Sequence, residues 1–197
     1  MWYTIFRAGC IIFLKLFFRL KIEGRENLPK KSNYIVVANH ASFLDPLVVA
    51  AAIPAKVYCI ASRSLYAFPK LKWALRKLDC LPTGASSECA IELLVKNNIV
   101  GLFPEGGISR DGRLREFKRG AALLAMKTGR PIVPCAISGA FEALPIKAKF
   151  PRFVSITVRI CKPVFLLKEF EDVIDDSDLQ EGITRIKNAI KEKINGK

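Results

Sequence analysis

The sequence predicts a single α/β domain with a mixed, mostly parallel central sheet that is flanked by helices. Three observations lead to this prediction. The chain has 197 residues, of which 51% are apolar, and this is the usual size of one domain with a sizeable core. Short, nearly continuous apolar runs alternate with helical patterns, as in α/β folds. Near the end, one run alternates strictly between apolar and polar residues, which indicates a half-exposed, antiparallel strand.

Four of the apolar runs are predicted to be buried strands, because a strand that is covered on both faces has no polar side. They span residues 34–38, 57–60, 99–103 and 132–137. Helical patterns are expected between them at about 46–53, 68–78, 86–97 and 117–128. The alternating run covers 153–160.

A last helix is predicted to begin at a capping box, in which the first side chain and the fourth bond each other's backbone amides. The box is Ser177-Asp178-Leu179-Gln180. The helical period then places one apolar face on the core, formed by Leu179, Ile183, Ile186, Ile190 and Ile194.

Residues 1–20 are predicted to form a helix in the membrane interface, ahead of one domain that spans 21–197. The stretch 8–19 is very apolar, but Lys15 interrupts it well short of the ~20 apolar residues that cross a bilayer. A cleaved signal peptide is not expected either, because no apolar segment precedes Cys10. The segment is therefore expected to lie on the membrane without spanning it.

The charges and aromatic residues of this segment suit an in-plane helix. On a helix Arg7, Lys15 and Arg19 fall within about 120° of one another and leave a broad apolar face. Trp2 and Tyr3 suit the headgroup boundary, and the cations suit anionic lipid. The alternative is an ordinary first helix that packs on the core.

The overall charge calls for an anionic partner. The chain holds 32 basic and 18 acidic residues, for a net charge of +14. Nucleic acid and an anionic membrane both fit this balance. Six cysteines without a CxxC pair, and a single histidine, do not predict a metal site, and we expect reduced, structural thiols of a cytoplasmic protein.

The histidine follows the first predicted strand, where α/β sheets carry their sites. It belongs to the segment Asn39-His40-Ala41-Ser42-Phe43-Leu44-Asp45-Pro46. A histidine can take the proton of an alcohol that attacks a carbonyl, and a carboxylate can orient the imidazole and stabilise its cation. Asp45 before Pro46 is also typical of a helix N-cap before a first-turn proline, and the two roles can coexist.

A glycine-rich segment follows the third predicted strand. Gly106 and Gly107 allow backbone amides to approach a phosphate or an oxyanion. A cluster of cations follows, comprising Arg110, Arg113, Arg115, Lys118 and Arg119. Such a cluster suits a phosphate-bearing substrate, although a glycine turn with solvated charges would have the same composition.

Taken together, these segments resemble the motifs of the glycerolipid acyltransferase family. The segment from Asn39 to Asp45 is similar to the first motif of that family. Phe103-Pro104-Glu105-Gly106 is similar to the third motif, and Ile132-Val133-Pro134 to the fourth. Phe117-Lys118-Arg119-Gly120-Ala121 resembles the stretch that follows the third. The resemblance covers about residues 20–165 and is strongest to the bacterial 1-acyl-glycerol-3-phosphate (lysophosphatidic acid) acyltransferases.

The resemblance implies an O-acyltransferase of phospholipid biosynthesis with His40 as general base and Asp45 as its orienting partner. It implies acyl-CoA or acyl carrier protein as donor, a lyso-lipid acceptor, and no cofactor, metal or covalent intermediate. The expected location is peripheral, on the cytoplasmic face of the cell membrane. Substrate binding is assigned to Arg63, Glu105, Gly106, Gly107, Ser109, Arg110 and Lys118.

Two departures from the family pattern concern the acceptor. Where many relatives have Glu-Gly-Thr-Arg-Ser, this chain has Glu105-Gly106-Gly107-Ile108-Ser109, without the arginine expected to bind the acceptor phosphate. A second arginine is absent around residues 81–85. Arg110 could substitute by a shift in register, or the acceptor is a different lysophospholipid.

Two other classes of function are left open. A catalytically silent lipid-binding protein would keep the fold and lose acceptor recognition. A nucleic-acid-binding protein would use the net charge, but it leaves the apolar first segment unexplained and no nucleic-acid motif is present, so no nucleic-acid partner is expected. A serine hydrolase is not predicted, because the sequence has no Gly-x-Ser-x-Gly segment.

Overall fold

The apolar runs of the sequence form the middle of one sheet. A computed structural model describes residues 2–30, 33–84, 86–166 and 174–195, and these residues contain a seven-stranded sheet in the order β1-β7-β6-β2-β5-β3-β4. The strands are β1 (Lys21–Glu23), β2 (Ile35–Ala38), β3 (Val57–Ala61), β4 (Leu81–Pro82), β5 (Ile99–Leu102), β6 (Ile132–Ser138) and β7 (Thr157–Ile160). Strands β6, β2, β5, β3 and β4 are parallel, and β7 is antiparallel to β6. The predicted mixed, mostly parallel sheet is confirmed.

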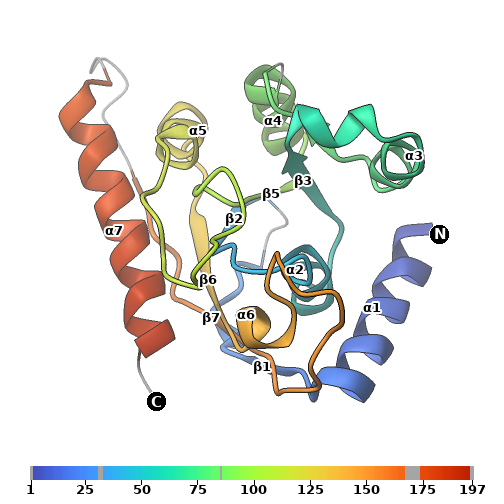
Figure 1. The fold of residues 1–197 in the computed structure, drawn as a ribbon. Coiled ribbons are helices and arrows are strands. Elements are labelled where there is room, and N and C mark those ends of the chain that lie inside the picture. Colours follow the sequence, from blue (N-terminus) through green and yellow to red (C-terminus); the bar gives the residue numbers. More distant parts are fainter. Residues whose placement is uncertain (1, 31–32, 85, 167–173, 196–197) are drawn as a thin grey trace.

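Helices cover both faces of this sheet (Figure 1). They are α1 (Trp2–Phe18), α2 (Asp45–Ala52), α3 (Pro69–Lys77), α4 (Ser86–Val95), α5 (Gly120–Thr128), α6 (Ala140–Ala143) and α7 (Asp176–Asn195). Two 3-10 helices lie at Arg25–Asn27 and Arg63–Ala67. Along β2, Val36 and Ala38 pack in the core with α1 and α2, whereas Ile35 and Val37 pack in the core with α4, α5 and α7. Both faces are therefore buried, which explains the continuous apolar runs.

Two predicted elements begin later than the sequence pattern indicates. Residues 153–156 keep the alternating burial, but the strand begins only at Thr157, where the chain pairs with Ser138 of β6. The helix expected from 117 begins at Gly120, and just before it the amide of Lys118 donates to the Pro104 carbonyl (2.8 Å). For the strand, the pairing partner decides the boundary.

The cap of α7 lies two residues before the predicted one. The Asp178 amide donates to the Asp175 carboxylate (2.9 Å), and the Asp175 amide donates to the Asp178 carboxylate (2.9 Å). These reciprocal bonds form a capping box from Asp175 to Asp178, so the box predicted to begin at Ser177 is wrong. The amide and hydroxyl bonds lower the pKa of Asp175 to about 2. The apolar face is confirmed, with Leu179, Ile183, Ile186 and Ile190 buried and Ile194 partly buried.

Helix α1 is tied to the domain through one of its predicted surface cations. Arg7 donates from Nε to the Ile53 carbonyl (2.8 Å) at the end of α2, and Leu14 and Phe18 are buried in the core. A cation at a helix C-terminus satisfies free carbonyls and opposes the helix dipole. Arg7 is therefore half-buried against the end of α2, whereas Lys15 and Arg19, with which it was expected to attract anionic lipid, are exposed.

The six cysteines are all free thiols, as predicted. Burial raises the pKa of Cys59 to about 12 and that of Cys10 to about 11. A raised pKa leaves little reactive thiolate near neutral pH, so these residues behave as small apolar groups. Cys89 on α4 is the exposed member of the set.

Candidate active site

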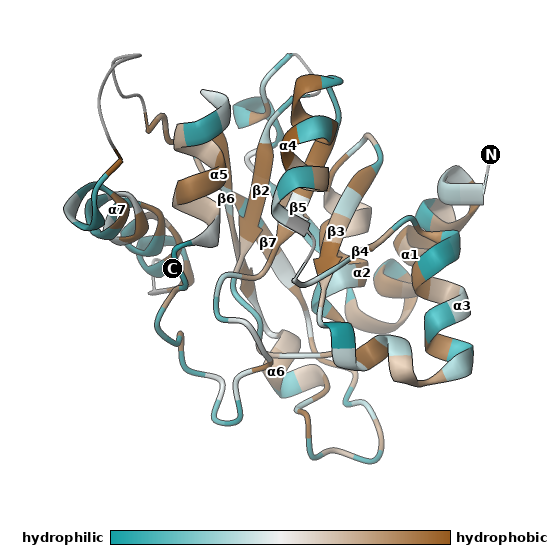
Figure 2. Ribbon diagram, turned by 90° about the horizontal axis from the view of Figure 1, so that it is seen from above, coloured by the Kyte–Doolittle hydropathy of each residue, from teal (hydrophilic) through white to brown (hydrophobic). Residues whose placement is uncertain are grey.

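The two motif segments leave neighbouring strands at the same edge of the sheet. β2 pairs in parallel with β5 on one side and with β6 on the other. Because parallel strands end at one edge, the segments that begin at Asn39 and Phe103 lie side by side (Figure 2). The chain continues from β2 toward β3 and from β5 toward β6, in opposite directions across the sheet. This edge is therefore a topological switch point, where α/β sheets form sites.

His40 and Asp45 form a hydrogen-bonded pair at this edge. Nδ1 of His40 lies 2.9 Å from Oδ2 of Asp45. The Asp45 side chain is fully buried, whereas 14% of the His40 side chain is exposed. In the tautomer that donates the Nδ1 proton to this carboxylate, Nε2 is left as an acceptor. The pair therefore has the geometry of a general base with an orienting carboxylate.

Asp45 is held by the loop that it orients. Its Oδ2 atom also accepts the amides of Ala41 and Ser42, both at 2.7 Å. No side-chain capping bond is found at the start of α2, and Leu44 occupies the N-cap position. The sequence allowed both a cap and a catalytic role for Asp45. The carboxylate instead points back to the loop, with Pro46 in the first turn.

Glu105 connects the two motif segments through backbone amides. Its Oε1 accepts the His40 amide (2.7 Å), and its Oε2 accepts the Arg115 amide (3.1 Å). Glu105 is 3% exposed. Burial raises the pKa of its carboxyl above the usual value, against the lowering effect of the two amide bonds. The contacts of Glu105 are those of a group that positions His40, and substrate contact stays a prediction.

Ser109 and Asn39 fasten the same loop from two sides. The Ser109 amide donates to the His40 carbonyl (2.7 Å), and its hydroxyl lies 2.8 Å from the Arg113 carbonyl. The Asn39 side chain donates to the Ile137 carbonyl (2.9 Å) and accepts the Ile137 amide (2.7 Å). Ser109, predicted to bind substrate, is thus a buried link within the protein. Asn39 locks the end of β2 to β6.

The glycine turn lies under cationic side chains. Gly106 has a φ of +69°, and a Cβ there would meet Nζ of Lys118 at 2.5 Å. Lys118, predicted to bind substrate, therefore covers Gly106. The guanidinium of Arg115 donates to the Gly107 carbonyl (3.4 Å). A larger residue at position 106 would be strained and would displace this lysine.

The two arginines proposed for substrate binding lie at separate places. Arg110 directly follows Ser109 and is exposed beside the His40 loop. Arg63 begins the 3-10 helix after β3, and its guanidinium lies 4.0 Å from the Cβ position of Gly84. That turn belongs to the region around residues 81–85 where the family resemblance led us to expect an arginine. Arg119 belongs to a different contact, an ion pair with Asp176 of α7.

Two contacts of the site were not identified from the sequence. The Phe103 ring stacks on the His40 imidazole, with 4.2 Å between the ring centres. The Ser42 hydroxyl donates to the Leu144 carbonyl (2.8 Å) beyond α6. Phe103 and Ser42 both occur in the motif segments, but the partner of each is distant in sequence. Only the position of Phe103 and Ser42 in those segments could have indicated that they belong to the site.

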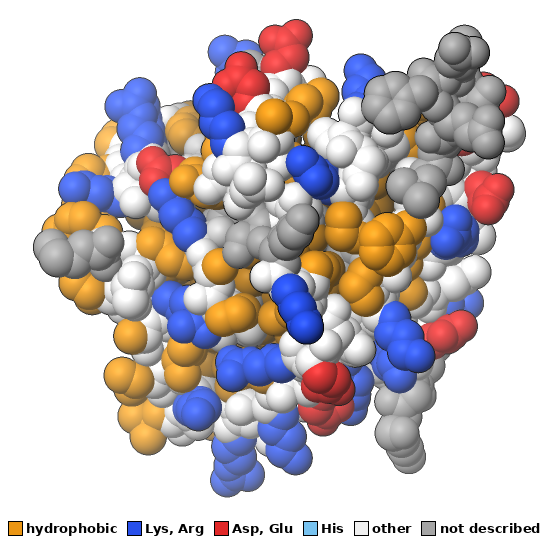
Figure 3. Space-filling view, turned by 180° about the vertical axis from the view of Figure 1, so that it is seen from behind, with side chains coloured by type: hydrophobic (Ala, Val, Ile, Leu, Met, Phe, Trp, Pro, Cys, Tyr) orange, Lys and Arg blue, Asp and Glu red, His pale blue; other side chains and the backbone are white. Residues whose placement is uncertain are grey.

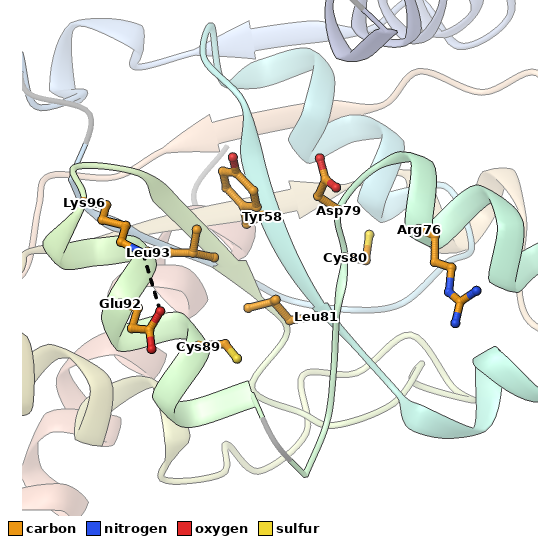
Figure 4. Close-up of a pocket in the computed structure, with 9 residues that line it drawn as sticks. All are labelled: Tyr58, Arg76, Asp79, Cys80, Leu81, Cys89, Glu92, Leu93 and Lys96. Atoms are coloured by element: carbon orange, nitrogen blue, oxygen red, sulfur yellow. Dashed lines mark ion pairs between the residues drawn. The ribbon is translucent and has the colours of Figure 1, made fainter.

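A cavity of about 530 Å³ lies elsewhere, between the end of α3, the helix α4 and the strands β3 and β4 (Figure 4). Tyr58, Cys80 and Leu93 line it, together with the Lys96–Glu92 ion pair. None of the predicted site residues lines this cavity. It is therefore separate from the candidate active site.

Comparison with known proteins places these features in a family. The family model described as Acyltransferase matches residues 19–138. A chloroplastic 1-acyl-sn-glycerol-3-phosphate acyltransferase of Brassica napus is 32% identical over 76% of this chain and 46% of its own length. The 1-acyl-sn-glycerol-3-phosphate acyltransferase of Borreliella burgdorferi is 27% identical over 88% of this chain and 73% of its own length. The chain thus spans about half of the plant relative.

A solved structure extends the likeness to the fold. The crystal structure of the 1-acyl-sn-glycerophosphate (LPA) acyltransferase PlsC from Thermotoga maritima matches with a TM-score of 0.79 and 28% identity. The match covers 97% of this chain and 79% of that one. The matched region includes both motif segments and the strands that carry them. By sequence and by fold, this chain belongs to the acyltransferase family.

Proposed function

We propose that this protein transfers a fatty acyl group from acyl-CoA or acyl carrier protein to a lysophospholipid hydroxyl, with 1-acyl-glycerol-3-phosphate as the foremost acceptor. The observation that carries the proposal is the 2.9 Å His40–Asp45 contact at the switch point of the sheet. The names of the relatives from Borreliella burgdorferi and Thermotoga maritima support the reaction class and the acceptor.

The reaction needs one base and no covalent intermediate. His40 Nε2 takes the proton of the acceptor hydroxyl as its oxygen attacks the thioester carbonyl. Asp45 stabilises the imidazolium that forms, as a buried carboxylate does in acyl-transfer triads. When the carbon–sulfur bond breaks, the imidazolium returns the proton to the leaving thiolate. The products are the ester and the free thiol carrier.

Charge at the glycine turn suits the oxyanion and the acceptor phosphate. The Gly106 amide already donates to the Phe103 carbonyl (3.1 Å), so we assign the oxyanion to the Gly107 amide and the Lys118 ammonium. Arg110, exposed beside the His40 loop, is assigned to the phosphate, and Arg63 to the far side of the substrate.

A product assay tests this function directly. Purified protein is incubated with labelled acyl-CoA or acyl carrier protein and a panel of lyso-lipids, and the products are identified by mass. We expect phosphatidic acid from 1-acyl-glycerol-3-phosphate. A different diacyl lipid would correct the acceptor, whereas lipid binding without any product would favour the silent lipid-binding protein.

Arg110→Ala is expected to raise KM for one substrate selectively, by about tenfold, because one charge-assisted phosphate contact contributes about 1.5–3 kcal/mol before solvent screening. Steady-state kinetics with each substrate varied in turn measure this change. Arg185→Ala is the matched control, since Arg185 is exposed on α7. Equal changes in both KM values, or none, would show that Arg110 is only a solvated charge.

We further propose that α1 binds the cytoplasmic face of an anionic membrane. Its exposed side carries Trp2, Ile5, Ile12 and Leu16, which are 58–72% exposed. Among the described helices, none is both long and apolar enough to cross a bilayer. On the face drawn in Figure 3, Lys and Arg side chains lie among apolar ones, a mixture that suits an anionic lipid surface.

Ile12→Ser with Leu16→Ser is expected to weaken binding to anionic vesicles by roughly 10- to 100-fold, because two aliphatic side chains no longer enter the interface. Co-sedimentation with vesicles measures this change. The side chains are 65% and 72% exposed, so the fold should persist. Val95→Ser on α4, where Val95 is 61% exposed, is the control. Unchanged binding by the double variant would exclude α1 as the anchor.

A further inference from the structure

The loop between α6 and β7 exposes aromatic and cationic side chains together. Phe150 is 80% exposed and Phe153 is 67% exposed. Lys147, Lys149 and Arg152 lie between or beside them and are exposed as well. The loop, residues 145–153, has no acidic residue. Exposed apolar groups among cations are characteristic of surfaces that contact anionic lipid.

This 145–153 loop is held in place by bonds within the protein. The Arg152 amide donates to the Ala143 carbonyl (2.7 Å), which closes the loop at its base. The Phe153 ring lies against Phe17 and Phe18 of α1, at 5.7 and 6.2 Å between ring centres. The exposed Phe153 of the loop is therefore continuous with the aromatic residues at the end of α1, the proposed membrane anchor.

The loop also begins beside the catalytic residues. Leu144, the residue before it, accepts the Ser42 hydroxyl (2.8 Å), and the Ser42 amide donates to Asp45 (2.7 Å). The loop extends from α6 on the side of the sheet where the strands end (Figure 2). A surface that binds this loop would therefore also be held against the active-site edge, and not only against α1.

We propose that the 145–153 loop is a second lipid-contacting element, which inserts Phe150 into the interface of an anionic phospholipid leaflet. Lys147 and Lys149 bind the headgroup phosphates around it. A single in-plane helix leaves the protein free to rotate about the helix axis, whereas a second contact fixes the rotation. The two contacts together turn the His40 edge toward the leaflet. The benefit of this orientation rests on the proposed function, because it serves an acceptor that resides in the leaflet.

The test compares Phe150→Ser with Phe165→Ser on sealed vesicles. Phe165 is 53% exposed, and its neighbour Val164 pairs with Ile132 at the opposite end of β6 from the site. Vesicles of phosphatidylcholine with phosphatidylglycerol are sedimented with the protein in the absence of substrates. We expect about tenfold weaker binding for Phe150→Ser, from the loss of one interfacial aromatic side chain, and wild-type binding for the control.

A charge variant tests the second half of the proposal. Lys147→Ala with Lys149→Ala should weaken binding to the anionic vesicles several-fold and leave the weak binding to pure phosphatidylcholine unchanged. Arg185→Ala with Lys191→Ala on α7 removes the same charge from exposed positions elsewhere and is the control. Equal losses in both double variants would mean that only net charge matters and would overturn a specific role of the loop.

Activity separates this proposal from the proposed function. Phe150→Ser should lower turnover of bilayer-embedded acceptors and leave turnover of short-chain, water-soluble acceptors at the wild-type value. Unchanged vesicle binding by Phe150→Ser, with a raised KM for acyl carrier protein alone, would make the loop a protein-docking surface and overturn the proposal. Because vesicle binding is measured without substrates, a failure of the acyl-transfer assignment would not alter its result.

Discussion

His40→Ala is expected to lower acyl transfer by about 10² to 10⁴, because the loss of a positioned general base removes the acceptor of the hydroxyl proton. The fold should persist. The imidazole is partly exposed, its ring stacks on one face only, and the backbone contacts of His40 with Glu105 and Ser109 do not need the side chain. Turnover of a short-chain acceptor and thermal unfolding measure the two effects.

His40→Gln is the control for packing in this experiment. Glutamine fills part of the same space and can donate to Asp45, but it cannot take a proton near neutral pH. Both variants should therefore be equally inactive. Wild-type turnover in His40→Ala, at matched thermal stability, would show that another group is the base.

Asp45→Asn is expected to lower turnover on the order of 10³, with a smaller loss of stability. The carboxylate accepts Nδ1 of His40, and its replacement by an amide removes the charge that stabilises the imidazolium. Bonds from the amides of Ala41 and Ser42 lose their charged acceptor, which costs about 1–3 kcal/mol. Single-turnover rates and denaturant unfolding separate the two losses.

Ser42→Ala is the matched control, because it disturbs the same loop without touching the proton transfer. It removes the 2.8 Å bond to the Leu144 carbonyl and leaves this half-buried carbonyl without that partner, at a cost of about 1–3 kcal/mol. Stability should fall by a similar amount in both variants, but turnover should fall much further in Asp45→Asn. Equal losses of turnover would reduce Asp45 to a structural role.

The α/β class and the middle of the sheet could be predicted because burial on both faces requires continuous apolar strands. The runs at 34–38 and 99–103 became β2 and β5 within one residue at each end. The short outer strands β1 and β4 were not predicted, because three and two residues carry too little pattern. Their strand conformation depends on their partners β7 and β3.

Charged residues were harder to place than apolar ones. The helical period placed Arg7 with Lys15, but the free carbonyls at the end of α2 bind its guanidinium. Substrate binding by Glu105 stays a prediction, but its bond to the His40 amide could not be predicted, because it depends on the parallel pairing of β2 and β5. One long polar side chain can satisfy several partners, and the partner it meets depends on the packing of distant segments.

The sequence by itself determined the local chemistry of this protein. His40 and Asp45 are five residues apart across the junction of a strand and a helix, so their contact follows from local geometry. Only the tertiary structure decided what surrounds that pair. Glu105, Phe103 and Leu144 reach it from segments 60 to about 100 residues away, through strand order and loop packing. The contact between His40 and Asp45 depends on a few neighbouring residues, whereas the contacts with Glu105, Phe103 and Leu144 depend on the free energy of the whole core.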